Sequence, residues 1–131
     1  MGYVTVLVAA AAAFALGAVW YMVFRDAWVK ASGVATDESG KPAGGGSPVP
    51  YLIAALCLVL VAGMMRHVFA QAGIEAPGKG FLAGLGNGLF VVAPWIVINN
   101  TYGMRPRALS LIDGGYAATG CAVIGLVLTI L

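Results

Sequence analysis

Charged residues are scarce in this chain. Lys, Arg, Asp and Glu make up only 9% of the 131 residues, whereas soluble domains carry about 25%. An ordinary water-soluble surface is therefore excluded, and a net charge of +2 is too small to support nucleic-acid binding. Hydrophobic residues reach 61%, above the roughly 45 to 50% of soluble domains. The composition predicts a membrane protein.

Residues that carry chemistry are also few. The chain has one histidine, His67, and two cysteines, Cys57 and Cys121, which lie inside apolar stretches without a CxxC spacing. Buried free cysteines of this kind usually pack as small apolar residues. The sequence contains no GxSxG, HExxH, P-loop or dinucleotide-binding pattern. We therefore expect no enzyme activity, no metal site and no cofactor.

Four long apolar runs organise the chain. Each approaches the roughly 20 residues that an α-helix needs to cross the hydrocarbon core, and none has the short alternating pattern of barrel strands. The sequence predicts an all-α membrane protein in which residues 1–131 form a single domain of four transmembrane helices in an antiparallel bundle. The expected helices cover about 3–30, 50–72, 79–100 and 107–131.

The loop at 31–49 is rich in Gly, Ser and Pro. Such a composition buries too little apolar surface to fold alone and predicts a flexible tether. A docking loop for a cytoplasmic partner is the alternative.

Basic residues are distributed unevenly between the two ends of the expected bundle. Five flank the first and third loops and two border the second: Arg25, Lys30, Lys41, Arg105 and Arg107 against Arg66 and Lys79. The positive-inside rule then places the first and third loops in the cytoplasm. We expect a multi-pass protein of the bacterial inner membrane with both termini in the periplasm.

A stripe of small residues opens the third expected helix. Gly80, Gly84 and Gly88 follow the GxxxGxxxG spacing, which lets another helix approach closely. The stripe predicts tight packing, either within one subunit or in a homo-oligomer or larger membrane complex. The lipid bilayer is the other expected partner.

Several polar side chains lie within or beside the apolar runs. Because an unsatisfied amide or acid in hydrocarbon costs several kcal/mol, such groups face a helix interface, a cavity or the headgroups. The candidate polar intramembrane site consists of Asn87, Asn99, Asn100, Asp113 and Tyr116. Asp113 either locks the third and fourth helices together or forms a proton or cation site.

Aromatic and basic residues near the helix ends are typical of anchors at the lipid headgroups. This set comprises Trp20, Tyr21, Trp28, Trp95, Arg105 and Arg107. Pro94, late in the third helix, removes a backbone donor and leaves the carbonyl of Phe90 without its usual partner, which predicts a kink or a bound polar neighbour.

Two sequence blocks carry a family resemblance. They are AAFALGAVWYMVFRDAWVKASG at residues 12–33 and LIDGGYAATGCAVIGLVLTIL at residues 111–131, the second preceded by NNTYGMRPRALS. Together with the four-helix layout, they resemble the bacterial membrane family catalogued as domain of unknown function 1761. The family pattern has an Asn-Ala-Gly-Tyr-like run where this chain has Asp113-Gly114-Gly115-Tyr116, and its first loop is more charged. The resemblance implies an integral membrane protein of four helices and supplies no substrate, reaction or cofactor.

These features favour a non-catalytic structural or accessory component that acts through helix-helix contacts. The alternative is a small oligomeric transporter or channel for a proton, a cation or a small solute, with a path along Asn87, Asn99, Asn100 and Asp113.

Overall fold

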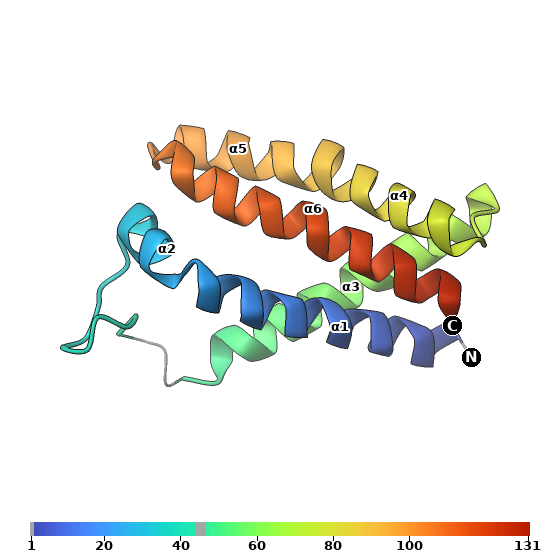
Figure 1. The fold of residues 1–131 in the computed structure, drawn as a ribbon, viewed down its shortest axis with the longest axis horizontal. Coiled ribbons are helices and arrows are strands. Elements are labelled where there is room, and N and C mark those ends of the chain that lie inside the picture. The colour runs from blue at the N-terminus through green and yellow to red at the C-terminus, as the bar shows by residue number, and fades with distance from the viewer. Residues whose placement is uncertain (1, 44–46) are drawn as a thin grey trace.

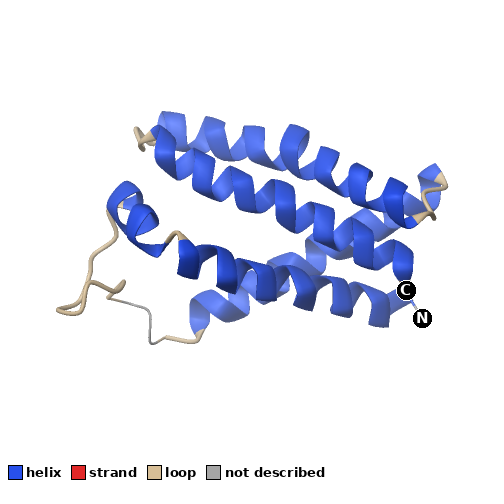
Figure 2. Ribbon diagram, viewed as in Figure 1, coloured by secondary structure: helices blue, strands red, loops and turns tan. Residues whose placement is uncertain are grey.

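The named elements of the fold are all helices (Figures 1 and 2). A computed structural model describes residues 2–43 and 47–131. The elements are α1 (Gly2–Val23), α2 (Arg25–Ser32), α3 (Val49–Ala72), α4 (Pro77–Asn87), the π-helix η1 (Gly88–Val92), α5 (Ala93–Tyr102) and α6 (Arg107–Ile130).

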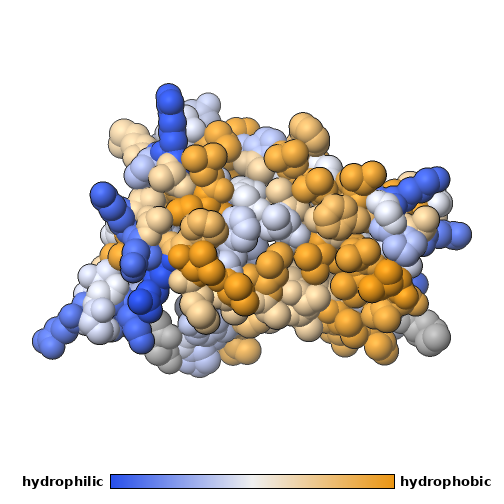
Figure 3. Space-filling view, in the orientation of Figure 1, coloured by the Kyte–Doolittle hydropathy of each residue, from blue (hydrophilic) through white to orange (hydrophobic). Residues whose placement is uncertain are grey.

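Four helical stretches are long and apolar enough to cross a membrane: α1, α3, the continuous stretch Pro77–Tyr102 and α6. Apolar side chains cover the middle of the molecule, and hydrophilic side chains gather at its two ends (Figure 3). This distribution matches a bilayer, whose core excludes polar groups and whose surfaces accept them. The predicted all-α fold with four long apolar helices is confirmed.

Helix α6 lies at the centre of the packing. Within an apolar stretch of 18 residues taken from each span, 44% of the stretch is buried in α6. The corresponding share is 17% in α3 and in Pro77–Tyr102. It contacts α1 on one side and α4, η1 and α5 on the other. Helix α3 crosses α1 obliquely (Figure 1), so much of its apolar surface stays outside the bundle.

The glycine stripe of α4 and η1 packs directly on α6. A Cβ atom added at Gly80, Gly84 or Gly88 would overlap the backbone carbonyl of Gly125, Cys121 or Ala117, respectively. Backbones this close leave no room for a side chain, which is the physical role of small residues in membrane helices. The stripe therefore joins two helices of the same chain.

The expected first helix over 3–30 is two helices in the structure. At Phe24 the backbone reaches φ −98° and ψ 15°, outside the helical range, and α2 turns away from the axis of α1 (Figure 1). Helix α2 ends at Ser32 and is followed by Gly33, whose φ of +69° is readily adopted only by glycine. The break brings α2 against α6.

Pro94 is accommodated without interrupting its span. The Ala93 N–H donates to the carbonyl of Gly88, five residues back, which is the π-helical pattern. A π-turn widens the helix by one residue and re-pairs groups that a proline disturbs. The span continues to Tyr102.

The first loop contains a hydrogen-bonded turn. Asp37 N–H donates to the Lys41 carbonyl at 2.8 Å, and Ala43 N–H donates to the Ala35 carbonyl at 2.8 Å. The expected flexible tether covers 31–49, of which 31–32 belong to α2 and 49 to α3. Its residues 44–46 lie outside the described part of the chain.

Candidate functional site

The carboxyl group of Asp113 lies where α1, α2 and α6 meet. The Tyr21 hydroxyl donates to Asp113 Oδ1 at 2.6 Å, and the Trp28 side chain lies close to the same carboxyl group. Tyr21 comes from the end of α1 and Trp28 from α2, so the break at Phe24 directs both side chains toward α6. The carboxyl group is thereby brought against two helices distant in sequence.

Aromatic rings enclose the bond between Tyr21 and Asp113. The ring of Tyr21 meets that of Tyr116 edge to face, with centroids 5.6 Å apart, and meets that of Trp28 similarly at 6.0 Å. Edge-to-face pairs at this separation are favourable. We call Tyr21, Trp28, Asp113 and Tyr116 the Asp113 cluster.

Two glycines make room for the rings between α1 and α6. A Cβ at Gly17 would lie 2.6 Å from the Tyr116 hydroxyl oxygen, and one at Gly115 would lie 2.8 Å from Cζ2 of Trp20. In the space left, the Tyr116 hydroxyl donates to the Ala13 carbonyl at 2.7 Å. The Trp20 indole donates to the Ile112 carbonyl at 2.9 Å. The α1–α6 interface is thus both closely packed and hydrogen-bonded.

The basic hairpin before α6 contacts α2. Arg105 Nη1 donates to the carbonyl of Ser32, a buried residue at the end of α2. The one ion pair among the described residues joins Arg25 and Asp26 at 3.9 Å. Asp113 is therefore held by a neutral donor, although Arg105 and Arg107 are the nearest cations in sequence.

The expected asparagines lie in three different surroundings. Asn87 Nδ2 approaches Cys121 Sγ at 3.7 Å, and Asn100 Nδ2 donates to the Ser110 hydroxyl at 3.2 Å across the hairpin. Asn99 is exposed on α5. Of the expected set, Asp113 and Tyr116 belong to the Asp113 cluster, and the three asparagines lie outside it.

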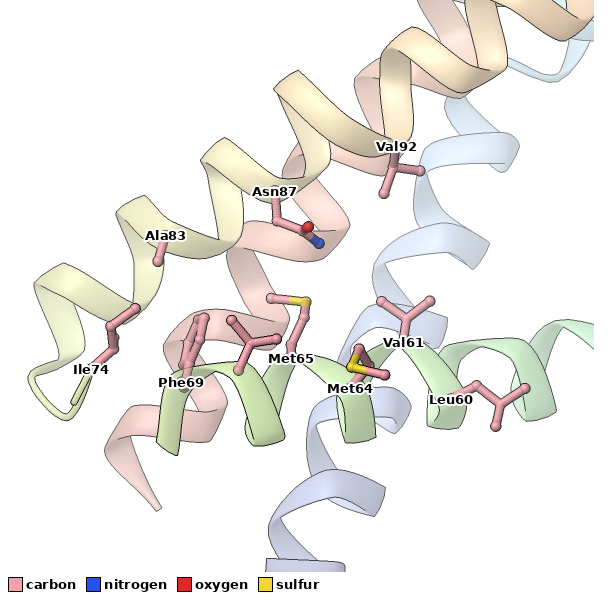
Figure 4. Close-up of a pocket in the computed structure, with 10 residues that line it drawn as sticks. Leu60, Val61, Met64, Met65, Phe69, Ile74, Ala83, Asn87 and Val92 are labelled. Atoms are coloured by element: carbon pink, nitrogen blue, oxygen red, sulfur yellow. The ribbon is translucent and has the colours of Figure 1, made fainter. Parts of the chain in front are cut away.

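Asn87 faces a laterally open groove between α3 and α4 (Figure 4). The groove has a volume of about 400 Å³ and is otherwise apolar, with Met64, Met65 and Phe69 on α3. Ile74 lies where the two helices meet, and the helices diverge from there (Figure 4). Cys121 is buried behind Asn87, whereas Cys57 is exposed on α3.

The expected anchors divide into two groups. Trp95 on α5, Arg105 and Arg107 are exposed near the hairpin end. Trp20 and Tyr21 instead bond to α6, and Trp28 lies close to Asp113. Within the described ranges, no three His, Cys, Asp or Glu side chains cluster closely enough to hold a metal ion.

The family model described as protein of unknown function (DUF1761) matches residues 4–129. The chain belongs to this family. The match takes in all four long helices, including the whole Asp113 cluster. No curated protein and no solved structure matches the DUF1761 chain.

In this DUF1761 chain the Asp113 cluster supplies one acid group and three aromatic side chains. Sequence analysis had assigned Tyr21 and Trp28 to the membrane surface. The sequence carried no clear signal for this pairing, because the break at Phe24 sets the direction of Trp28 relative to Tyr21. Asp113 and Tyr116, three residues apart on α6, do share a helical face. Chemically, the arrangement can bind a proton or tie helices together.

Proposed function

We propose that this DUF1761 chain is a non-catalytic structural or accessory component of a membrane, acting through helix-helix contacts. The observation that carries the proposal is the hydrogen bond from Tyr21 to Asp113, with Trp28 close to the same carboxyl group. These side chains belong to the same chain, so the acid serves the fold by holding α1 and α2 on α6. An intramembrane acid without such a donor would instead favour a transport role.

Large apolar faces support an association role. On α3, Leu52, Leu56 and Leu60 are each more than half exposed, and on α5 Trp95 is 62% exposed. In a membrane, either lipid or another helix covers such a face. The proposed partner is a second copy of this chain or another membrane protein.

The distribution of basic residues supports a location in the bacterial inner membrane with both termini in the periplasm. The first and third loops lie at the same end of the bundle (Figure 1). With their flanks they carry five of the seven basic residues, and the positive-inside rule assigns that end to the cytoplasm.

The alternative is a small oligomeric transporter or channel. Its support is the presence of Asp113 inside an apolar span. Against it, Asn87, Asn100 and Asp113 each bond a different neighbour. A shared polar path through one subunit would require them to converge.

Photo-crosslinking in cells tests the association role. A photoreactive amino acid at Leu56 samples the outer face of α3, and one at Leu7 samples an exposed position of α1. We expect protein adducts of discrete mass from at least one of these faces. Adducts with lipid alone at both positions would contradict the proposal.

A flux assay separates the two functions. In liposomes loaded with a pH-sensitive dye, the purified chain should give no proton flux that depends on Asp113. If wild-type liposomes conducted protons and Asp113→Asn abolished the flux with assembly intact, the transporter would replace the accessory role.

A further inference from the structure

A second cleft lies between α1 and α3, near the start of α1 and the end of α3. Its volume is about 660 Å³, and it is open to the surroundings of the bundle. Val6 on α1 and Val59, Leu60 and Met64 on α3 form its apolar wall. Its polar groups come from Tyr3, Arg66 and His67. One end of the cleft is thus basic and the rest is hydrocarbon.

Arg66 lies within the apolar span Val49–Ala72. It precedes the end of α3 by six residues, which is about 9 Å at 1.5 Å per residue. Its guanidinium lies against Gly2, in the first turn of α1. Among the described residues, no carboxylate lies within ion-pair distance of the Arg66 side chain.

The first turn of α1 adds to this positive character. The N-terminus of a helix carries partial positive charge and backbone N–H groups without intrahelical acceptors. The guanidinium of Arg66 and the first turn of α1 therefore meet at one place, close to the expected hydrocarbon boundary. An anion at that place would neutralise both, and guanidinium binds phosphate oxygens particularly well.

We propose that this cleft binds an anionic phospholipid, with its phosphate at Arg66 and His67 and an acyl chain along Val59, Leu60 and Met64. A guanidinium beside an apolar wall suits the phosphate and the acyl chain of a phospholipid. The apolar wall continues from Arg66 to Leu60, about 9 Å deeper along α3, so the cleft has room for a phosphate and the first part of an acyl chain. The site is independent of the Asp113 cluster, which lies at the opposite end of α1.

A substitution in the cleft can block the proposed acyl chain without altering Arg66. A Cβ at Gly63 meets only Val6 Cγ1, at 3.9 Å, an ordinary contact. Gly63→Leu should therefore fill the cleft while the helices keep their places. Gly86 on α4 has open space around its Cβ, which makes Gly86→Leu the matched control.

Lipid retention is measured by native mass spectrometry of the whole chain released from detergent micelles. The probes are dioleoylphosphatidylglycerol, dioleoylglycerol and inorganic phosphate. We expect phosphatidylglycerol to be retained, and dioleoylglycerol, which lacks the phosphate, to be lost. Inorganic phosphate in excess should leave the bound lipid in place, because it lacks the acyl chains.

The variants locate the site. Arg66→Gln should weaken phosphatidylglycerol retention about fivefold, and Arg66→Lys should restore most of it. Gly63→Leu should weaken retention as well, whereas Arg107→Gln and Gly86→Leu should leave it unchanged. Helical content measured by circular dichroism verifies that each variant is folded.

Three outcomes would overturn the proposal. The first is unchanged retention in folded Arg66→Gln or Gly63→Leu protein. The second is an equal loss in Arg107→Gln, which would mean nonspecific attraction. The third is displacement of the lipid by inorganic phosphate, which would mean that the site recognises the free anion.

Discussion

The hydroxyl of Tyr21 lies 2.6 Å from Asp113 Oδ1, joining residues 92 positions apart in sequence. This bond connects the first long helix with the last. Tyr116 packs on the same tyrosine ring, so loss of the bond would also disturb an aromatic contact. The relationship gives Asp113 a structural role that can be measured directly.

Removal of the Tyr21 hydroxyl should destabilise the folded chain. Hydrogen bonds between membrane helices contribute on average about 0.6 kcal/mol and at most about 1.7 kcal/mol, and we expect Tyr21→Phe to fall in this range. The measurement is SDS-induced unfolding in mixed micelles. Tyr102 is 86% exposed, so Tyr102→Phe is the control and should change nothing.

A double-mutant cycle tests whether the effect belongs to the pair. If the two groups act on each other, Tyr21→Phe and Asp113→Ala, each of which removes the bond, together should cost less than the sum of their separate effects. Full additivity would show that the bond contributes nothing to stability.

A substitution in the glycine stripe should destabilise the folded chain more strongly, and a closely matched control is available. Gly84→Leu would place a side chain on the Cys121 carbonyl, and overpacking of this kind typically costs about 1–3 kcal/mol or more. Gly86→Leu introduces the same side chain two residues away into open space. SDS-induced unfolding should separate the two variants, and equal stabilities would contradict the close α4–α6 packing.

Asp37 in the first loop should titrate below its usual range. The Ser39 hydroxyl donates to Asp37 Oδ1 at 2.6 Å, and this bond, with the Lys41 backbone N–H, lowers the pKa of the carboxyl group. Because the folded pKa is below the unfolded one, the contribution of these bonds to the turn is present above the unfolded pKa and lost as pH falls through the folded pKa. NMR titration of the carboxyl carbon measures it.

Substitution of Ser39 should shift that titration. Ser39→Ala removes the hydroxyl donor, so the pKa of Asp37 should rise toward its ordinary value. Ser47→Ala, which alters a hydroxyl bonded to Val49 N–H instead, should leave the Asp37 pKa where it is. An unchanged titration in Ser39→Ala would contradict the turn geometry.

The proposed topology predicts opposite labelling of the two ends. In intact cells, an impermeant thiol reagent should react with a cysteine introduced at Gly78, beside the second loop, and should spare one introduced at Ser39 in the first loop. Both variants are made with Cys57 and Cys121 replaced by serine. Labelling at position 39 and not at position 78 would show that the orientation is the opposite of the one proposed.

Composition and periodicity were sufficient to predict the helices. Apolar runs of about 20 residues leave helices as the practical solution, since backbone groups in hydrocarbon must bond internally. Helix interruptions were harder to predict. Phe24 carries no helix-breaking side chain, yet α1 ends at Val23. The break accompanies the packing of α2 on α6, a contact that the local sequence does not reveal.

The candidate site was predicted only in part. Asp113 and Tyr116 stood out because acids and phenols are unusual within apolar runs, and both belong to the cluster. Their partners did not stand out, since Tyr21 and Trp28 near a helix end are equally typical of headgroup anchors. Choosing between the two roles requires knowing which way α2 turns.

The amino-acid sequence by itself determined that the chain is helical, apolar enough to span a membrane four times and more basic at one end, because these properties follow from local composition. Only the tertiary structure decided that the glycine stripe meets α6 of the same chain, that Asp113 bonds Tyr21, and that Arg66 borders a cleft. Those relationships join segments far apart in sequence. They depend on the crossing and rotation of whole helices, which packing between their surfaces determines.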